Sequence, residues 1–182
     1  LAVILILILI IIIISTLNLT VASYNSGTPT SKDSESEGPK GQPQSGTPTF
    51  EGGKVTINGK EVPVEIDETV KPTFDDGTTE KQVPGEGTYT VAPDGTVTFV
   101  PEKSFTGTGT GVTVKRVDKN GTPVTAKYTP VVKKATPTGT DAVTEDVQGS
   151  TQTGKPEFKG GTVTVDGVEK TVPINEDVPA TF

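Results

Sequence analysis

The stretch TYTVAPDGTVTFV, residues 88–100, decides the fold class. Apolar side chains alternate with threonine on both sides of the central Pro93-Asp94-Gly95, which is the period of two expected of a half-buried β-strand. Proline sets φ for a turn, and glycine readily takes the left-handed conformation that such a turn needs. The stretch therefore predicts a β-hairpin.

Two further hairpins are predicted on either side of this one. Asn58-Gly59 separates two alternating runs within residues 54–64, and residues 118–121 (DKNG) do the same within residues 112–128. Asn-Gly between alternating runs is the strongest short hairpin signal. No stretch shows a helical period. Short, regularly spaced strands of this kind favour a sandwich or a barrel, and we predict an all-β fold, an immunoglobulin-like β-sandwich.

The predicted core consists of apolar residues on the alternating positions of these strands. It is thin for about 100 residues, so burial worth roughly 25 cal/mol per Å² predicts modest stability. The predicted core residues are Phe50, Val55, Ile57, Phe74, Tyr89, Val91, Val97, Phe99, Phe105, Val112, Val114, Val124 and Tyr128.

The chain repeats itself with an offset of 108 residues. Residues 28–74 align without gaps on residues 136–182; for example, Gln44 matches Gln152 and Phe50 matches Phe158. Solenoid repeats are shorter, about 20–50 residues, whereas a unit of this length is domain-sized. We therefore predict a tandem array of domains, like beads on a string.

The offset divides the chain into three parts. Residues 28–135 are predicted to be a complete repeat and residues 136–182 the truncated start of the next, partly ordered at best unless it packs on its neighbour. Residues 136–140 (TPTGT) are the predicted stiff linker between the repeats, and the acidic residues 32–37 are the matching linker of the first repeat. We expect the chain to be an internal piece of a longer protein.

Residues 1–27 form a non-repeat leader that begins with an apolar run. Residues 1–14 read LAVILILILIIIII, which is shorter than the about 20 residues that span a bilayer. We interpret the run as a remnant of a targeting segment or an artefact; a strand that pairs with a neighbour and a membrane span are the alternatives. It takes no part in the functional argument.

The composition excludes most catalytic chemistry. The chain contains no His, Cys, Met or Trp, so the usual ligands of zinc, copper, haem and iron–sulfur clusters are absent, as are the common Ser–His and Cys–His nucleophiles. Hydrolysis by a carboxylate pair remains, but aromatic residues are only 5% of the chain, too few for the platforms such sites use. We predict that the chain is not an enzyme and has no catalytic, cofactor-binding or metal-binding residues and no cofactor.

The charge argues against nucleic acid as a partner. The net charge is −7, and Arg116 is the sole arginine. An acidic chain with one arginine is poorly suited to phosphate backbones, and its charge favours solubility and repulsion between neighbours. We also predict no membrane contact for the repeat region.

Three patterns that resemble functional motifs have simpler interpretations. Residues 118–121 resemble the start of a calcium loop but lack its later ligands, so we predict a hairpin turn. The alternating glycines of residues 107–111 lack the helix and lysine of a phosphate loop, and we predict a strand or bulge approached closely by another backbone. An intramolecular Lys–Asn crosslink is a weaker alternative for this chain; its candidate residues are Lys54, Lys115, Lys127, Asn58 and Asn120.

Residues 74–132 resemble the CshA-type fibril repeat of streptococcal cell-wall-anchored surface adhesins. The resemblance rests on the strings VPGEGTY (residues 83–89), PDGTV (93–97) and FTGTGTGV (105–112), and it covers residues 28–182. It implies a secreted, extracellular protein anchored to the bacterial cell wall, with many repeats in series that build surface fibrils. It also implies that a non-repetitive N-terminal region does most of the host binding, including binding to fibronectin.

These observations predict a structural stalk, a fibril-forming repeat that projects an adhesive N-terminal region away from the cell wall. The predicted partners are neighbouring repeats of the same chain, and, through the parent protein, host extracellular matrix proteins or other bacterial surfaces. The alternative is that the repeat itself is a binding module for a host matrix protein such as fibronectin or for a glycan. That alternative needs an exposed aromatic or polar patch, for which three tyrosines offer little material.

Overall fold

The computed structural model describes residues 25–181, which contain strands and turns and no helix, so the all-β prediction is confirmed. The apolar run of residues 1–14, and with it most of the predicted leader, lies outside the described residues. Within residues 25–181 there is consequently no helix long and apolar enough to cross a membrane.

The strands of the described residues are short, apart from β13. In chain order they are β1 (Thr30–Lys32), β2 (Ser34–Pro39), β3 (Gln44–Gly46), β4 (Thr49–Glu51), β5 (Lys54–Ile57), β6 (Lys60–Pro63), β7 (Thr73–Phe74), β8 (Glu80–Val83), β9 (Gly87–Val91), β10 (Val97–Pro101), β11 (Gly107–Thr108), β12 (Val112–Val117), β13 (Pro123–Lys133), β14 (Thr138–Thr140), β15 (Glu157–Lys159), β16 (Thr162–Val165) and β17 (Val168–Thr171).

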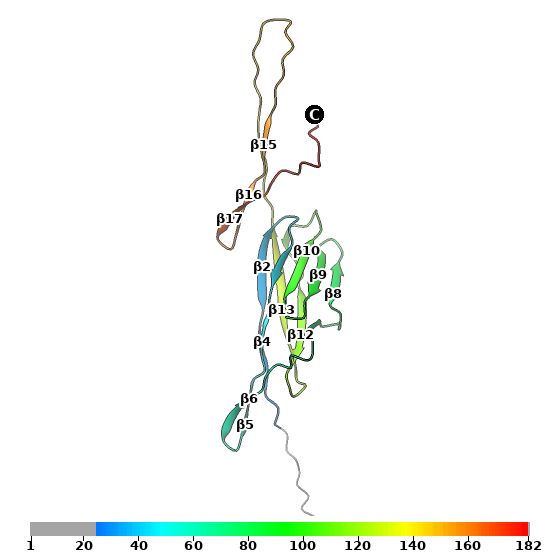
Figure 1. Cartoon of the computed structure of the whole chain (residues 1–182), viewed down its shortest axis with the longest axis vertical. Helices are drawn as coiled ribbons and strands as arrows, with labels where there is room; N and C mark the ends of the chain where they lie inside the picture. The colour runs from blue at the N-terminus through cyan, green and yellow to red at the C-terminus, as the bar shows by residue number, and fades with distance from the viewer. Residues whose placement is uncertain (1–24, 182) are drawn as a thin grey trace, which may run out of the picture.

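Two sheets form the centre of the molecule, which we call the body (Figure 1). One sheet has the strand order β3-β10-β9-β8, and the other has the order β11-β13-β12-β7. Neighbouring strands in both orders are antiparallel. The early strand β2 also joins the second sheet, where it pairs with the late strand β13 in parallel.

A single hydrophobic cluster draws residues from both sheets. The Tyr89 ring lies 4.5 Å from that of Phe99 and 6.4 Å from that of Tyr128, measured between centroids, which are ordinary distances for packed aromatic pairs. The cluster contains Phe74, Tyr89, Val91, Val97, Phe99, Val112, Val114, Tyr128 and Val132, with Phe50, Val83 and Phe105 packed against it.

Most of the predicted core is confirmed. Val55 and Val124 are also buried, whereas Ile57 is 44% exposed and was wrongly predicted as core. Ile57 lies near the tip of the β5–β6 hairpin, outside the body, where strand alternation alone does not bury a side chain. The prediction missed Ala126 and Val132 of the long strand β13.

The three predicted hairpins are all present, as β5–β6, β9–β10 and β12–β13. The β9–β10 turn closes with hydrogen bonds from Ala92 N to Thr96 O and from Gly95 N to Ala92 O, both 2.9 Å, and Gly95 has φ of 90°. In the β5–β6 turn, Asn58 and Gly59 have φ of 50° and 77°, as a type I′ turn requires.

The acidic segment of residues 32–37, predicted to be a linker, is instead largely a strand of the body. Residues 34–37 belong to β2, which pairs with β13 from Tyr128 to Lys133. The sequence shows no apolar alternation here because the strand packs through Ser36 and Gly38. The Ser36 hydroxyl lies 2.6 Å from the hydroxyl of Tyr128, and Gly38 is buried. A polar strand of this kind gives no hydropathy signal.

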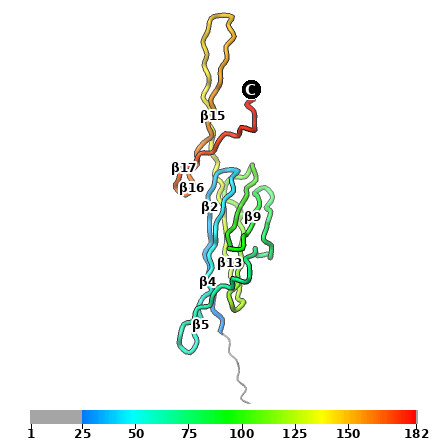
Figure 2. Tube along the Cα trace, in the orientation of Figure 1, coloured from blue at the N-terminus to red at the C-terminus, as the bar shows by residue number. Residues whose placement is uncertain are grey.

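The strands that follow the body repeat those at its start. The pair β14–β15 begins with Thr138 opposite Lys159, and the pair β1–β4 with Thr30 opposite Glu51, so each position is displaced by 108 residues. The hairpin β16–β17 likewise repeats β5–β6. The chain is long and narrow, with β5–β6 near one end of the body and β16–β17 near the other (Figures 1 and 2).

Candidate functional site at the end of the body

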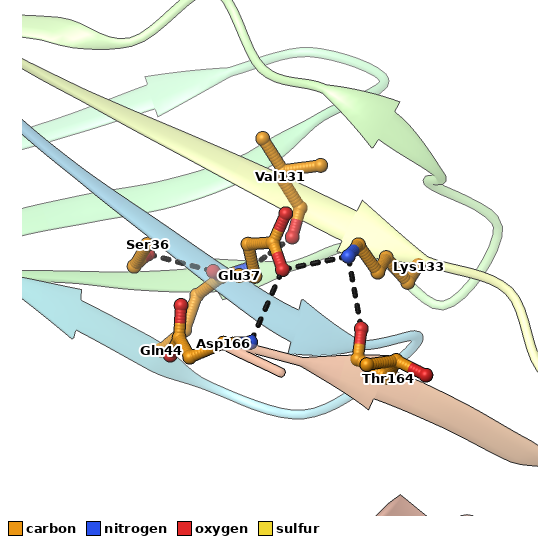
Figure 3. Close-up of polar contacts among 7 residues, drawn as sticks. All are labelled: Ser36, Glu37, Gln44, Val131, Lys133, Thr164 and Asp166. Carbon is orange, nitrogen blue, oxygen red and sulfur yellow. Dashed lines mark hydrogen bonds and ion pairs between the residues drawn. The ribbon is translucent and has the colours of Figure 1, made fainter. Parts of the chain in front are cut away.

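The β16–β17 hairpin meets the body where β2 and β13 end. Glu37 of β2 and Lys133 at the end of β13 form an ion pair, with Lys133 Nζ 2.6 Å from Glu37 Oε2 (Figure 3). About one third of each side chain is exposed, 33% for Glu37 and 35% for Lys133. The parallel pairing of β2 with β13 brings together two residues that are 96 positions apart.

Both charged groups also bind the backbone of the hairpin. The Lys133 ammonium donates a hydrogen bond of 2.9 Å to Thr164 O, and Asp166 N donates one of 3.3 Å to Glu37 Oε2 (Figure 3). A two-stranded hairpin leaves unpaired N–H and C=O groups along its outer edges. The ion pair satisfies one group of each kind on β16 and its turn, and charge-assisted hydrogen bonds of this type are stronger than neutral ones.

The surroundings favour the charged form of Glu37. The hydrogen bond from Lys133 and, next, the one from Asp166 N lower the pKa of this carboxyl group below its ordinary value. Glu37 therefore stays ionised to a lower pH than an isolated glutamate, and the contacts with the hairpin persist across the neutral range.

Burial of two apolar side chains accompanies the polar contacts. Val163 and Val165 of β16 are buried, while Thr162 and Thr164 are exposed. The neighbouring element on the body side is β2. We call this contact between the end of the body and the β16–β17 hairpin the junction, defined by Glu37, Lys133, Thr164, Val165 and Asp166.

A hydrogen-bonded group beside the junction fixes β2 and β3 on the body. The Ser36 hydroxyl donates to Gln44 Oε1 at 2.6 Å, and Gln44 Nε2 donates to Val131 O at 3.2 Å (Figure 3). The same bond recurs one repeat later, from the Thr144 hydroxyl to Gln152 Oε1, also at 2.6 Å. The same side-chain hydrogen bond is therefore made at equivalent positions of the two repeats.

Residues 118–121, which resemble the start of a calcium-binding loop, form a turn, as predicted. Asp118 Oδ1 accepts hydrogen bonds from Asn120 N and Thr122 N, at 2.9 and 2.8 Å, and Asp118 N bonds to Thr122 O. Within residues 25–181 there is no group of three or more acidic side chains placed to hold a metal ion.

The glycine-rich residues 107–111 form the predicted close approach. A Cβ atom on Gly111 would lie 2.4 Å from Tyr128 O, and Gly111 has φ of 75°. Glu86, which the sequence did not mark as functional, holds this segment. Its carboxylate accepts a hydrogen bond from Thr110 N at 2.9 Å and one from the Tyr89 hydroxyl at 3.1 Å. Burial, above all, raises the pKa of Tyr89, so its hydroxyl remains a donor.

The structure does not bring the candidate crosslinking residues together. Asn58 and Asn120 lie in turns, and the Lys54 ammonium pairs with Glu61 at 3.1 Å. Among the described residues no hydrogen bond joins a lysine side chain to an asparagine side chain. Arg116 is buried and pairs with Glu68 at 2.8 Å, so it is not displayed for phosphate groups.

These features define a tandem-repeat all-β protein whose repeats meet through a hairpin. The family model described as the surface adhesin CshA repetitive domain matches residues 26–132 and 134–182. The chain therefore belongs to this family of cell-surface adhesin repeats, as the sequence motifs predicted, and it is not an enzyme.

A solved structure with a similar sequence is the NMR structure of repeat domain 13 of the fibrillar adhesin CshA from Streptococcus gordonii. It is 70% identical over an alignment that covers 37% of this chain and 86% of that one, with a TM-score of 0.22. No curated protein matches the chain.

Proposed function

We propose that this chain is a segment of a stalk, in which repeats dock end to end and hold an adhesive N-terminal region away from the cell wall. The observation that carries the proposal is the placement of two equivalent hairpins, β5–β6 and β16–β17, near opposite ends of one body (Figure 1). When units stack through their opposite ends, the chain becomes longer, whereas contacts between the sides of units would fold the chain back on itself.

The domain division proposed for the stalk follows the repeat. Residues 28–135 form one unit and residues 136–182 the start of the next, which is supported by the recurrence of β1–β4 and β5–β6 as β14–β15 and β16–β17. Two sheets around one core, with an early strand parallel to the last strand of the body, support an immunoglobulin-like β-sandwich for each unit.

Anchoring and host contact are assigned to other parts of the parent protein. The family supports a place at the cell surface, and we propose that attachment to the wall and binding of host matrix proteins or other bacteria occur outside the residues described. Phe158 is an exposed aromatic residue, but its counterpart Phe50 packs against the body, so the exposure of Phe158 does not support a ligand site of the repeat.

Chains with increasing numbers of repeats test the proposal. Small-angle X-ray scattering compares three chains. They contain one, two or four copies of residues 26–133, and in each chain the last copy is followed by residues 134–182. We expect the maximum dimension to increase by the same increment with every added copy, while the cross-section stays constant. A maximum dimension that levels off, as for a compact globule, would contradict a stalk.

A further inference from the structure

Two equivalent positions near the tips of the two hairpins differ sharply in exposure. Val165 is 1% exposed, whereas Ile57, one repeat earlier, is 44% exposed. The preceding inward position does not differ, because Val163 and Val55 are 6% and 8% exposed. The difference is therefore confined to the tip, the part of the hairpin that reaches the junction.

The cause of the difference is the element beside each tip. Val165 lies between Thr164 and Asp166, whose backbone groups bind Lys133 and Glu37 at the end of the body. The β5–β6 tip has no such neighbour, because no body precedes β5 within residues 25–181. From this contrast we infer that the tip of β5–β6, formed by Thr56, Ile57 and Asn58, is a docking surface for the end of a preceding copy of this repeat. The inference rests on the proposed stalk function.

The free tip offers the same groups that the occupied tip uses. Thr56 O corresponds to Thr164 O, and Asn58 N corresponds to Asp166 N. The two turns have the same backbone, since Asn58 and Asp166 have φ of 50° and 49° and the following glycines both have φ of 77°. The two groups that bind are backbone atoms, so the exchange of Asn for Asp does not alter them.

One repeat therefore carries both halves of the contact. Glu37 and Lys133 form the receiving end, and the tip of β5–β6 forms the inserting end. Glu145 follows Glu37 by one repeat, so the carboxylate of the next receiving end is also present. Contacts between different surfaces of identical units do not close on themselves unless the rotation between units allows a ring, so they extend into open strings.

The absence of cysteine allows a direct test by single-cysteine labelling. In the chain as it stands, Ile57→Cys and Val165→Cys are reacted separately with Ellman's reagent. We expect Ile57→Cys to react at least about tenfold faster, because reaction at a buried site waits for local opening. Val55→Cys is the matched control, since its position is buried with or without a preceding body.

A chain with a second copy of residues 26–133 placed before residue 26 then supplies the missing partner. We expect Ile57→Cys in the second copy to slow to the rate of Val165→Cys, while Ile57→Cys in the first copy stays fast. Glu37→Gln together with Lys133→Met in the first copy is expected to restore fast reaction at the second-copy Ile57→Cys without affecting Val55→Cys.

Equal, fast reaction of Ile57→Cys in both copies would overturn the inference, as would fast reaction of Val165→Cys in the present chain. The scattering series separates this failure from failure of the stalk itself. If the maximum dimension still grows linearly while Ile57→Cys stays reactive, the repeats are extended but undocked; if the dimension levels off, the proposed function fails.

Discussion

Replacing Phe99 with alanine is expected to lower the free energy of unfolding of the body by about 3–5 kcal/mol, the usual cost of truncating a fully buried aromatic ring. Phe99 is fully buried and connects two other rings, with centroids 4.5 Å from Tyr89 and 6.0 Å from Phe105. The cluster is small, so few neighbouring side chains are available to collapse into the cavity. Urea unfolding, monitored by circular dichroism, measures this loss of unfolding free energy.

Phe158→Ala is the matched control for this substitution. Phe158 is 58% exposed and lies outside the body, so its truncation is expected to change the free energy of unfolding of the body by less than about 0.5 kcal/mol, as surface substitutions usually do. Similar losses for the two variants would show that the cluster around Phe99 does not hold the body together.

The second large effect is expected for Gly111→Ala. Alanine at a φ of 75° costs about 1–2 kcal/mol. Its Cβ would also lie 2.4 Å from Tyr128 O, a backbone atom of β13 that cannot move without disturbing the sheet, and such overpacking adds about 1–3 kcal/mol. We therefore expect a total loss of about 2–5 kcal/mol, measured by the same unfolding experiment.

Gly121→Ala separates the cost of the left-handed backbone from the cost of overpacking. Gly121 has φ of 79°, but a Cβ there meets no atom within 4 Å. The loss of unfolding free energy in Gly121→Ala should therefore be limited to the cost of the left-handed backbone, about 1–2 kcal/mol. If both glycine variants lose the same stability, the close approach between Gly111 and β13 does not constrain the body.

Local signals made the hairpins and most of the core predictable from the sequence. The turns at Asn58-Gly59, residues 93–95 and residues 118–121 are each specified by a few neighbouring residues, and the strands beside them alternate. The cluster followed from that alternation, because Tyr89, Val91, Val97 and Phe99 occupy the inward positions of a single hairpin.

Long-range polar contacts explain what the sequence did not reveal. Strand β2 packs through Ser36, whose partner Tyr128 is 92 positions away, and a serine offers no hydropathy signal. The junction depends in the same way on Glu37 and Lys133, which read as ordinary surface charges until β2 and β13 are paired. The identity of Gln44 with Gln152 was the available hint, since the same hydrogen bond recurs at both positions.

Exposure at the hairpin tip could not be predicted from either repeat alone. Ile57 and Val165 are both apolar residues before the same type of turn, and sequence patterns treat them alike. They differ because one has a body beside it and the other does not. Burial at this position therefore depends on whether a body lies beside the hairpin tip.

The central claim is that successive repeats are held in a fixed, docked arrangement, and pulsed electron paramagnetic resonance measures this most directly. Nitroxide labels are attached to the Val100→Cys, Val168→Cys double variant, whose two exposed sites lie on strand β10 of the body and on strand β17 of the docked hairpin. We predict one narrow distance distribution, centred on the separation of these sites in the structure. A broad distribution would contradict the account, because it would show that the β16–β17 hairpin moves freely relative to the body.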